Sequence, residues 1–484
     1  MFHGPGHDKG LIELARMAME QCSFRTLPTA KAKNMTLFSD QRRLDAARKV
    51  IEHVGGLIDA RFSVRLWDRS MVPLGQNVDP DFFIAINSPA VIGMLLRRPT
   101  LENLLLQYVS GSIDIHGDLI DFVAAARDEG ARSPRKRLRG IKKSFLLKQA
   151  LPFLFSSRPE TNEKHQYPGD EVGRKESRRD NQEFIQFHYD ISNEFYALFL
   201  GKEMQYSCGY FRTPDTSLDQ AQHDKLEMIC RKLRLQPRDR FLDIGCGWGG
   251  LICHAAQHYG VQAHGVTLSQ TQFDYATEKV KRLGLESQIR VELRDYSGLE
   301  GEYDKIASIG MFEHVGIANM TRYFQKIKSL LRDRGILLNH GICRQAKRTR
   351  RAARKIRPER RLLLKYIFPG SELDQVGHTI DLLQICRFEV HDVEAWREHY
   401  ALTARHWYRG LIAHKEEAIE LVGKETFRMW ALYLASGSIG FADGSTHICQ
   451  VVASRRSSKG ASGLPLTRAD LYRTSKPFQE RSKA

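Results

Sequence analysis

Residues 310–316 read G-M-F-E-H-V-G, so an apolar run ends abruptly in a glutamate and a histidine. The stretch before them, D-K-I-A-S-I-G at 304–310, has the pattern of a buried strand. A strand that merely reaches the surface could also turn polar here. A second predicted strand, G-I-L-L-N-H at 335–340, ends in His340. Because ligands of an open α/β sheet bind beyond the carboxyl ends of its strands, two such ends favour an active site.

A glycine-rich loop, F-L-D-I-G-C-G-W-G-G-L at 241–251, joins another predicted strand to a helix. Glycines let the backbone turn tightly and approach a ligand closely. The loop fits the dinucleotide pattern G-x-G-x-x-G and also the D-x-G-x-G-x-G loop of methyltransferases that bind S-adenosylmethionine. A dinucleotide site needs an acid after the next strand, which here ends G-V-T-L-S-Q at 265–270, so the second pattern is favoured. Its residues are Asp243, Gly245, Gly247 and Gly249.

The composition limits the class of protein. The chain has 484 residues, of which 42% are hydrophobic, which is enough for two or three domains with buried cores. Lys and Arg number 74 against 57 Asp and Glu, and the net charge of +17 favours an anionic partner. Eight dispersed cysteines without metal spacing predict reduced thiols in a cytosol and no metal site. We expect no transmembrane helix and no signal peptide.

Changes in composition divide the chain into five predicted segments. Residues 1–45 read as an N-terminal extension, and 46–130 as a small α+β domain. Residues 131–183 combine a basic block, an apolar stretch and a polar linker. The basic and apolar stretches are typical of a membrane-surface segment, although a helix packed on the core is an equally good interpretation. Residues 184–452 form one α/β domain, and 453–484 a disordered basic tail.

The α/β domain alternates apolar runs with helical patterns. This alternation predicts a mostly parallel, doubly wound, Rossmann-like sheet. The predicted strands span 239–244, 261–267, 289–293, 304–310 and 335–340.

Several longer blocks resemble the cyclopropane-fatty-acyl-phospholipid synthase family, which is related to the mycolic acid cyclopropane synthases. The resemblance covers 184–452 strongly and 60–125 more weakly. The blocks Y-S-C at 206–208 and E-H-V-G at 313–316 are together specific, whereas the glycine loop alone is not. A basic run at 343–361 departs from the family pattern. The resemblance implies an S-adenosylmethionine-dependent methyltransferase fold with a small N-terminal α+β lipid-binding domain.

The resemblance also implies an activity. A methylene from S-adenosylmethionine is added to the cis double bond of unsaturated acyl chains in membrane phospholipids, which forms cyclopropane fatty acids. A carbocation is deprotonated with the help of a bound bicarbonate. Motif matching implies a catalytic set of Cys208, Glu313, His340, Ile342 and Tyr400. The implied cofactor contacts are Tyr206, Ser207, Asp243, Gly245, Gly247, Gly249, Thr267, Gln272 and Asp295.

The carbocation chemistry requires a dry pocket lined by aromatic rings. Residues 184–211 supply such rings, although helix core is the better interpretation for most of them. The rings are Phe184, Phe187, Tyr189, Phe195, Tyr196, Tyr206, Tyr210 and Phe211.

Three other interpretations of the function stay open. The family includes fatty-acyl C-methyltransferases whose products are methyl- or methylene-branched chains. The chain could also methylate another small acceptor, or bind lipid or nucleic acid without catalysis. No nucleic-acid reading motif is present, so the expected partner is an anionic phospholipid membrane. We expect a cytoplasmic enzyme, peripheral on the inner membrane face, and the family suggests a homodimer.

Overall fold

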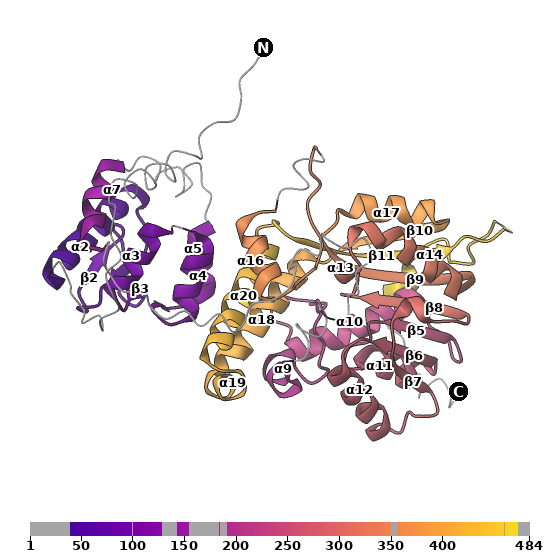
Figure 1. Cartoon of the computed structure of the whole chain (residues 1–484). Helices are drawn as coiled ribbons and strands as arrows, with labels where there is room; N and C mark the ends of the chain where they lie inside the picture. The colour runs from indigo at the N-terminus through magenta and orange to yellow at the C-terminus, as the bar shows by residue number, and fades with distance from the viewer. Residues whose placement is uncertain are drawn as a thin grey trace, which may run out of the picture.

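A computed structural model describes residues 39–98, 100–127, 143–153, 183, 191–349, 356–458 and 460–472. Its larger part is built around a seven-stranded sheet with the order β10-β11-β9-β8-β5-β6-β7 (Figure 1). Within this sheet, strands β5 to β9 are parallel to one another, and β11 runs antiparallel to both of its neighbours. The strands are β5 (Arg240–Ile244), β6 (Gln262–Thr267), β7 (Ile289–Leu293), β8 (Tyr303–Ile309), β9 (Leu331–Cys343), β10 (Phe388–Ala395) and β11 (His447–Arg455).

The predicted Rossmann-like sheet is confirmed, with two additions. The five predicted strands correspond to β5–β9, and β9 is longer than the predicted 335–340. Strands β10 and β11 were not predicted. The predicted boundary at residue 452 falls inside β11, and the described residues beyond it continue through α21 (Ala469–Tyr472), which packs on α10.

Helices cover both faces of the sheet. Neighbouring residues of each strand point to opposite faces, so each strand can pack against helices on both sides. Phe241 of β5 packs among α10 (Leu218–Leu233) and α11 (Gly250–Tyr259). Leu242, the next residue, packs among α14 (Met320–Leu330) and α17 (Val376–Ile385) on the other face. The remaining elements on the sheet are α12 (Gln270–Arg282), η2 (Tyr296–Gly298), α13 (Phe312–Val315) and η3 (Ile317–Asn319).

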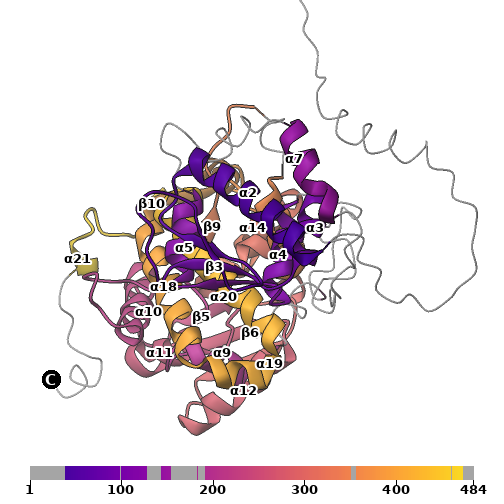
Figure 2. The same cartoon turned by 90° about the vertical axis from the view of Figure 1, so that its left-hand side faces the viewer.

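The small N-terminal unit has its own sheet, with the order β2-β1-β3-β4, and its own core. Figure 2 views the molecule from the side of this unit. Its α7 and η1 fall inside the predicted basic segment 131–183, and Phe153 of η1 is buried in the unit's core. The elements are α2 (Asp40–Ile58), β1 (Ser63–Arg65), β2 (Met71–Pro73), β3 (Phe83–Ile86), α3 (Pro89–Arg97), α4 (Leu101–Val109), β4 (Ile113–His116), α5 (Leu119–Arg127), α7 (Lys143–Ala150) and η1 (Leu151–Phe153).

A group of helices stands between the small unit and the sheet (Figure 1). Helix α20 contacts α4 and α5 of the small unit as well as α18. Phe195 and Tyr196 are fully buried in the aromatic core of this group, as the core interpretation of these rings predicts. The group consists of α9 (Asn193–Leu200), α16 (Pro358–Tyr366), α18 (Arg397–Ala413), α19 (Lys415–Val422) and α20 (Lys424–Ala442).

Some predicted segments lie outside the described residues. They are most of the extension 1–45, most of the segment 131–183, part of the basic run 343–361 and the end of the tail 453–484. The rings of Phe184, Phe187 and Tyr189 are also outside. Among the described residues, no helix has both the length and the apolar character needed to cross a membrane.

Candidate active site

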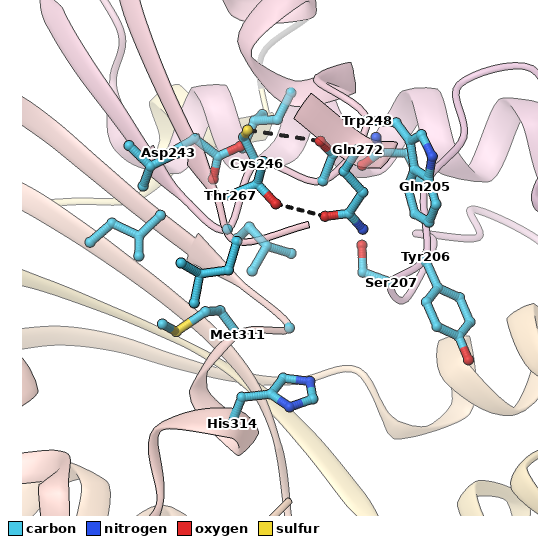
Figure 3. A pocket seen from close by; sticks show the side chains of 18 of the residues that line it. Gln205, Tyr206, Ser207, Asp243, Cys246, Trp248, Thr267, Gln272, Met311 and His314 are labelled. Atoms are coloured by element: carbon cyan, nitrogen blue, oxygen red, sulfur yellow. Dashed lines mark hydrogen bonds between the residues drawn. The ribbon is translucent and has the colours of Figure 1, made fainter. Parts of the chain in front are cut away.

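A cavity opens at the carboxyl ends of β5, β6 and β8, where the glycine loop turns into α11 (Figure 3). Its empty volume, including its open mouth, is about 910 Å³. Gly245 and Gly247 line it with positive φ angles of 80° and 54°. A side chain would be strained at either position, so the sequence supplies glycine where the backbone must approach a ligand.

Eight of the nine predicted cofactor residues line this cavity: Tyr206, Ser207, Asp243, Gly245, Gly247, Thr267, Gln272 and Asp295. Gly249 does not line it. A Cβ at Gly249 would lie 3.1 Å from the Cβ of Ala276, so this glycine allows α11 to pack against α12. The contacts of all nine residues with the cofactor stay predictions.

The polar side chains of the cavity are held by one another. Thr267 Oγ1 donates to Gln272 Oε1 over 2.8 Å, which leaves the amide NH₂ of Gln272 for a ligand (Figure 3). Lys225, which is fully buried, donates to Gln205 Oε1 and, over 3.1 Å, to Ser207 Oγ. Lys225 could not be predicted from the sequence, because in the pattern of α10 it is only one more charged residue of an amphipathic helix.

Burial shifts the pKa values of two residues that line the cavity, Asp243 and Lys225, in opposite directions. Desolvation raises the pKa of Asp243 to about 7, while nearby Lys225 works against that rise. Desolvation lowers the pKa of Lys225 to about 7, and Cys208 and Asp243 oppose that fall. Each of the two groups thus favours the charged form of the other, against the effect of burial.

None of the five predicted catalytic residues lines the cavity. Glu313 follows β8, and His340 and Ile342 lie near the end of β9. His340 is fully buried on β9, and its Nδ1 accepts from the Gln450 amide over 2.9 Å. The Gln450 carbonyl oxygen accepts from Lys232 Nζ over 2.7 Å, which fixes the orientation of the amide. The proton of neutral His340 therefore lies on Nε2, which has no hydrogen-bond partner among the described residues. Burial, with Lys225 and Lys232 nearby, holds the pKa of His340 well below its usual value.

Glu313 lies on α13, directly after β8, as predicted. Its Oε1 accepts from the backbone N–H of Ile342, and its Oε2 has no hydrogen-bond partner among the described residues. Desolvation raises the pKa of Glu313 to about 7. The half-buried Arg360 on α16 is near enough to oppose this rise. Glu313 thus presents a buried oxygen that can accept or donate a hydrogen bond near neutral pH.

Trp396 connects three of the predicted catalytic residues. Its carbonyl oxygen accepts from Cys208 Sγ over 3.6 Å and from the backbone N–H of Tyr400 over 3.0 Å. Its ring packs edge-on against His340, with 5.2 Å between the ring centroids. Burial raises the pKa of the Cys208 thiol, which is therefore neutral. The structure thus gathers Cys208, His340 and Tyr400 around Trp396, and joins Glu313 to Ile342.

The comparisons with known proteins decide the family. The family model described as "Mycolic acid cyclopropane synthetase" matches residues 176–451. The chain belongs to this family. Its fold and its family identify it as an S-adenosylmethionine-dependent methyltransferase of the cyclopropane synthase group.

Relatives of this cyclopropane synthetase family cover the chain to different extents. A Pseudomonas putida protein named "Probable fatty acid methyltransferase" is 37% identical over 412 residues, which are 85% of this chain and 96% of that protein. "Cyclopropane mycolic acid synthase 2" of Mycobacterium bovis is 36% identical over 282 residues, which are 55% of this chain and 93% of that protein. The match to the fatty acid methyltransferase therefore covers more of this chain.

Solved structures agree with the family assignment. The mycolic acid cyclopropane synthase CmaA1, solved with S-adenosylhomocysteine and CTAB, is 30% identical with a TM-score of 0.54. The match covers 58% of this chain and 100% of that chain.

Proposed function

We propose that the chain adds a methylene from S-adenosylmethionine to the cis double bond of an unsaturated acyl chain in a membrane phospholipid, which forms a cyclopropane. The observation that supports this most is that Glu313 Oε2 and His340 Nε2 are among the buried polar atoms that have no hydrogen-bond partner in the described part of the chain. Burying such atoms without partners costs free energy, so their presence suggests a ligand that pairs with them. A small-molecule methyltransferase with a solvated acceptor does not need them.

The S–CH₃ bond breaks, and its electron pair stays on sulfur. The π pair of the alkene forms the new C–C bond and leaves a carbocation. A proton leaves the new methyl group, and the electron pair of that C–H bond closes the ring. Water would capture the cation, so the protein must keep the pocket dry. The aromatic core beside Cys208 and Tyr206 suits that task.

The residues present fit a bicarbonate ion, which the family implies. His340 Nε2–H can donate to it, and Glu313 Oε2 can accept its hydroxyl proton. Lys225 and Lys232 place positive charge near His340, which favours an anion. Bound bicarbonate would supply a base for the departing proton. Cys208, Tyr400 and the backbone at Ile342 would complete its surroundings.

A second candidate follows from the coverage of the relatives. A relative that covers 85% of this chain is named a fatty acid methyltransferase. The same site could therefore yield branched chains. If the carbocation loses a proton from the carbon that carries the new methyl group, a methyl-branched alkene forms; if a 1,2-hydride shift comes first and the methyl group then loses a proton, a methylene branch forms. Methylation of another small acceptor is the remaining alternative.

Mass spectrometry of unsaturated phospholipid vesicles incubated with the protein and S-adenosylmethionine tests these proposals. A gain of one CH₂ per acyl chain, with olefinic NMR signals replaced by upfield cyclopropane protons, is expected. A new exocyclic alkene signal would favour a methylene-forming enzyme. No gain, with both cofactor and vesicles bound, would contradict a lipid acceptor. The matched variant Glu313→Gln is expected to bind the cofactor and lose most turnover.

The proposed partner is the anionic inner face of the cytoplasmic membrane, to which the enzyme would bind peripherally. The net charge of +17 supports this proposal. Leu147 on α7 and Leu151 on η1 are 71% and 49% exposed, which suits contact with lipid. A homodimer also stays a proposal, and light scattering of the full chain tests it.

A further inference from the structure

Three histidines from two helices converge on the side of the sheet covered by α10 and α11. His223 belongs to α10, and His254 and His258 to α11. One ring nitrogen of each lies within 4.8 Å of the other two. We propose that these histidines bind a divalent transition-metal ion, with Zn²⁺ as the ion of reference.

The chemistry of the three side chains suits such an ion. Imidazole nitrogens are preferred ligands of Zn²⁺, and three of them leave one tetrahedral position for water. His254 and His258 are four residues apart, so they lie on the same face of α11. Their ring centroids are 4.5 Å apart, and the centroid of His223 is 5.2 Å from that of His254. A metal ion would therefore need only small side-chain movements to bind all three.

A carboxylate supports the buried member of the group. Glu227 Oε2 lies 3.4 Å from His254 Nε2, and Glu227 Oε1 accepts from Arg231 Nε over 2.7 Å. Histidine ligands of metals usually pair their second nitrogen with such a group, which orients the ring and raises its basicity. Glu227 thus already lies where a carboxylate would orient the ring of a metal-bound His254.

The site is accessible from solvent and is not blocked by neighbouring charges. His223 and His258 are exposed, whereas His254 is buried. Asp224 Oδ1 lies 3.9 Å from His223 Nδ1, but Asp224 is itself paired with Arg212 through a 2.6 Å contact. A hydrated ion could thus reach the exposed rings first and then contact the buried one.

A metal here would connect two helices that also form the cofactor cavity. His223 precedes Lys225 by two residues on α10, and His254 follows Leu251 by one turn of α11. Lys225 and Leu251 both line the cavity. A metal bridge would therefore restrain the cavity from outside without touching the cofactor.

Thermal unfolding of the full chain without a histidine tag tests the site. The protein is stripped with a chelator and then supplied with Zn²⁺ alone. We expect the melting temperature of the wild type to rise by about 2–5 °C. The variant His223→Ala/His258→Ala should lose this rise, and the control His53→Ala/His414→Ala, which changes two exposed histidines elsewhere, should keep it.

X-ray absorption of the zinc-loaded wild type gives an independent readout. We expect about one zinc per chain with nitrogen and oxygen neighbours only. A sulfur neighbour would assign the metal to cysteines and overturn the proposal, as would equal melting shifts in all variants or none in the wild type. If the double variant does not fold, His258→Gln should bind Zn²⁺ at least about tenfold more weakly than the wild type.

Discussion

The tautomer of His340 is set by a side chain 110 residues further along the chain, Gln450. The sequence predicted that His340 and Glu313 would lie at the same edge of the sheet, because each follows a parallel strand. It could not predict the Glu394–Lys232–Gln450–His340 chain of contacts, because that chain joins β10, α10, β11 and β9. Motif matching thus identifies the ligand-facing groups, while the groups that orient them depend on tertiary contacts.

Glu313→Gln should change the pH dependence of stability. Between the ordinary pKa of 4.5 and the folded value of about 7, the folded protein keeps a proton that the unfolded chain has lost. Wild-type stability should therefore fall as pH rises through this window, by about 3 kcal/mol in total. Glutamine does not ionise, so the variant should exceed the wild type in free energy of unfolding above pH ~7, and match it below pH ~4.5.

Urea unfolding of both proteins across that pH range measures the difference. Glu416→Gln, which changes an exposed glutamate of α19, is the matched control and should follow the wild type. A difference between Glu313→Gln and the wild type that does not vary with pH would contradict the assigned burial of this carboxyl.

Lys225→Met should weaken cofactor binding. The change removes the donor that holds Gln205 and Ser207 at the cavity wall and leaves both acceptors unpaired. Losing a charged hydrogen bond of this kind costs about 1.5–3 kcal/mol, or roughly a tenfold to hundredfold rise in Kd. Calorimetry with S-adenosylhomocysteine measures it. Lys281→Met, at an exposed position of α12, should bind normally, and an unchanged Kd for Lys225→Met would remove this lysine from the site.

At the scale of secondary-structure elements, periodicity was informative where strands are buried on both faces. Strands β5 and β8 and the predicted part of β9 are largely buried, because helices cover both sides of the sheet. Strand β7, I-R-V-E-L, was also predicted, although it lies at an edge of the sheet and alternates apolar and charged residues. Strand β10, F-E-V-H-D-V-E-A, alternates polar and apolar residues at the edge of the sheet and was missed. Helix α7 fits one of the two interpretations of its segment, a helix packed on the core, which the sequence alone did not separate from a membrane-surface segment.

The contact of α20 with the small unit depends on Arg428. This nearly buried guanidinium donates to Tyr108 O over 2.7 Å, to Ile113 O over 2.9 Å and to Asp114 Oδ1 over 3.0 Å. It also lies 4.2 Å from the centroid of the Tyr108 ring. One side chain thus joins α20 to the end of α4 and the start of β4.

Arg428→Ala should loosen this junction at a cost of about 2–4 kcal/mol. We expect limited proteolysis to separate the small unit from the remainder faster than in the wild type. Arg409→Ala, at an exposed position of α18, is the control. Equal cleavage rates for all three proteins would show that the apolar contacts of α4 and α5 hold the junction without Arg428.

At the scale of the whole molecule, the excess of positive charge should govern membrane contact. Each Lys or Arg near an anionic surface contributes about 1 kcal/mol. Raising salt from about 0.1 M to about 1 M shortens the Debye length from about 10 Å to about 3 Å. Sedimentation with anionic vesicles should therefore fall strongly, while zwitterionic vesicles and duplex DNA serve as controls. Binding that high salt leaves unchanged would contradict the electrostatic account.

The order of strands in the large sheet has a kinetic consequence. Strand β11 is the last in sequence, yet it lies between β9 and β10. Until it inserts, β9 and β10 each present an unpaired edge, which is a template for association with other chains. The five parallel strands can meanwhile form around the cofactor cavity. Refolding should therefore pass through a species that binds cofactor before Gln450 reaches His340, and that species is the one most prone to aggregate.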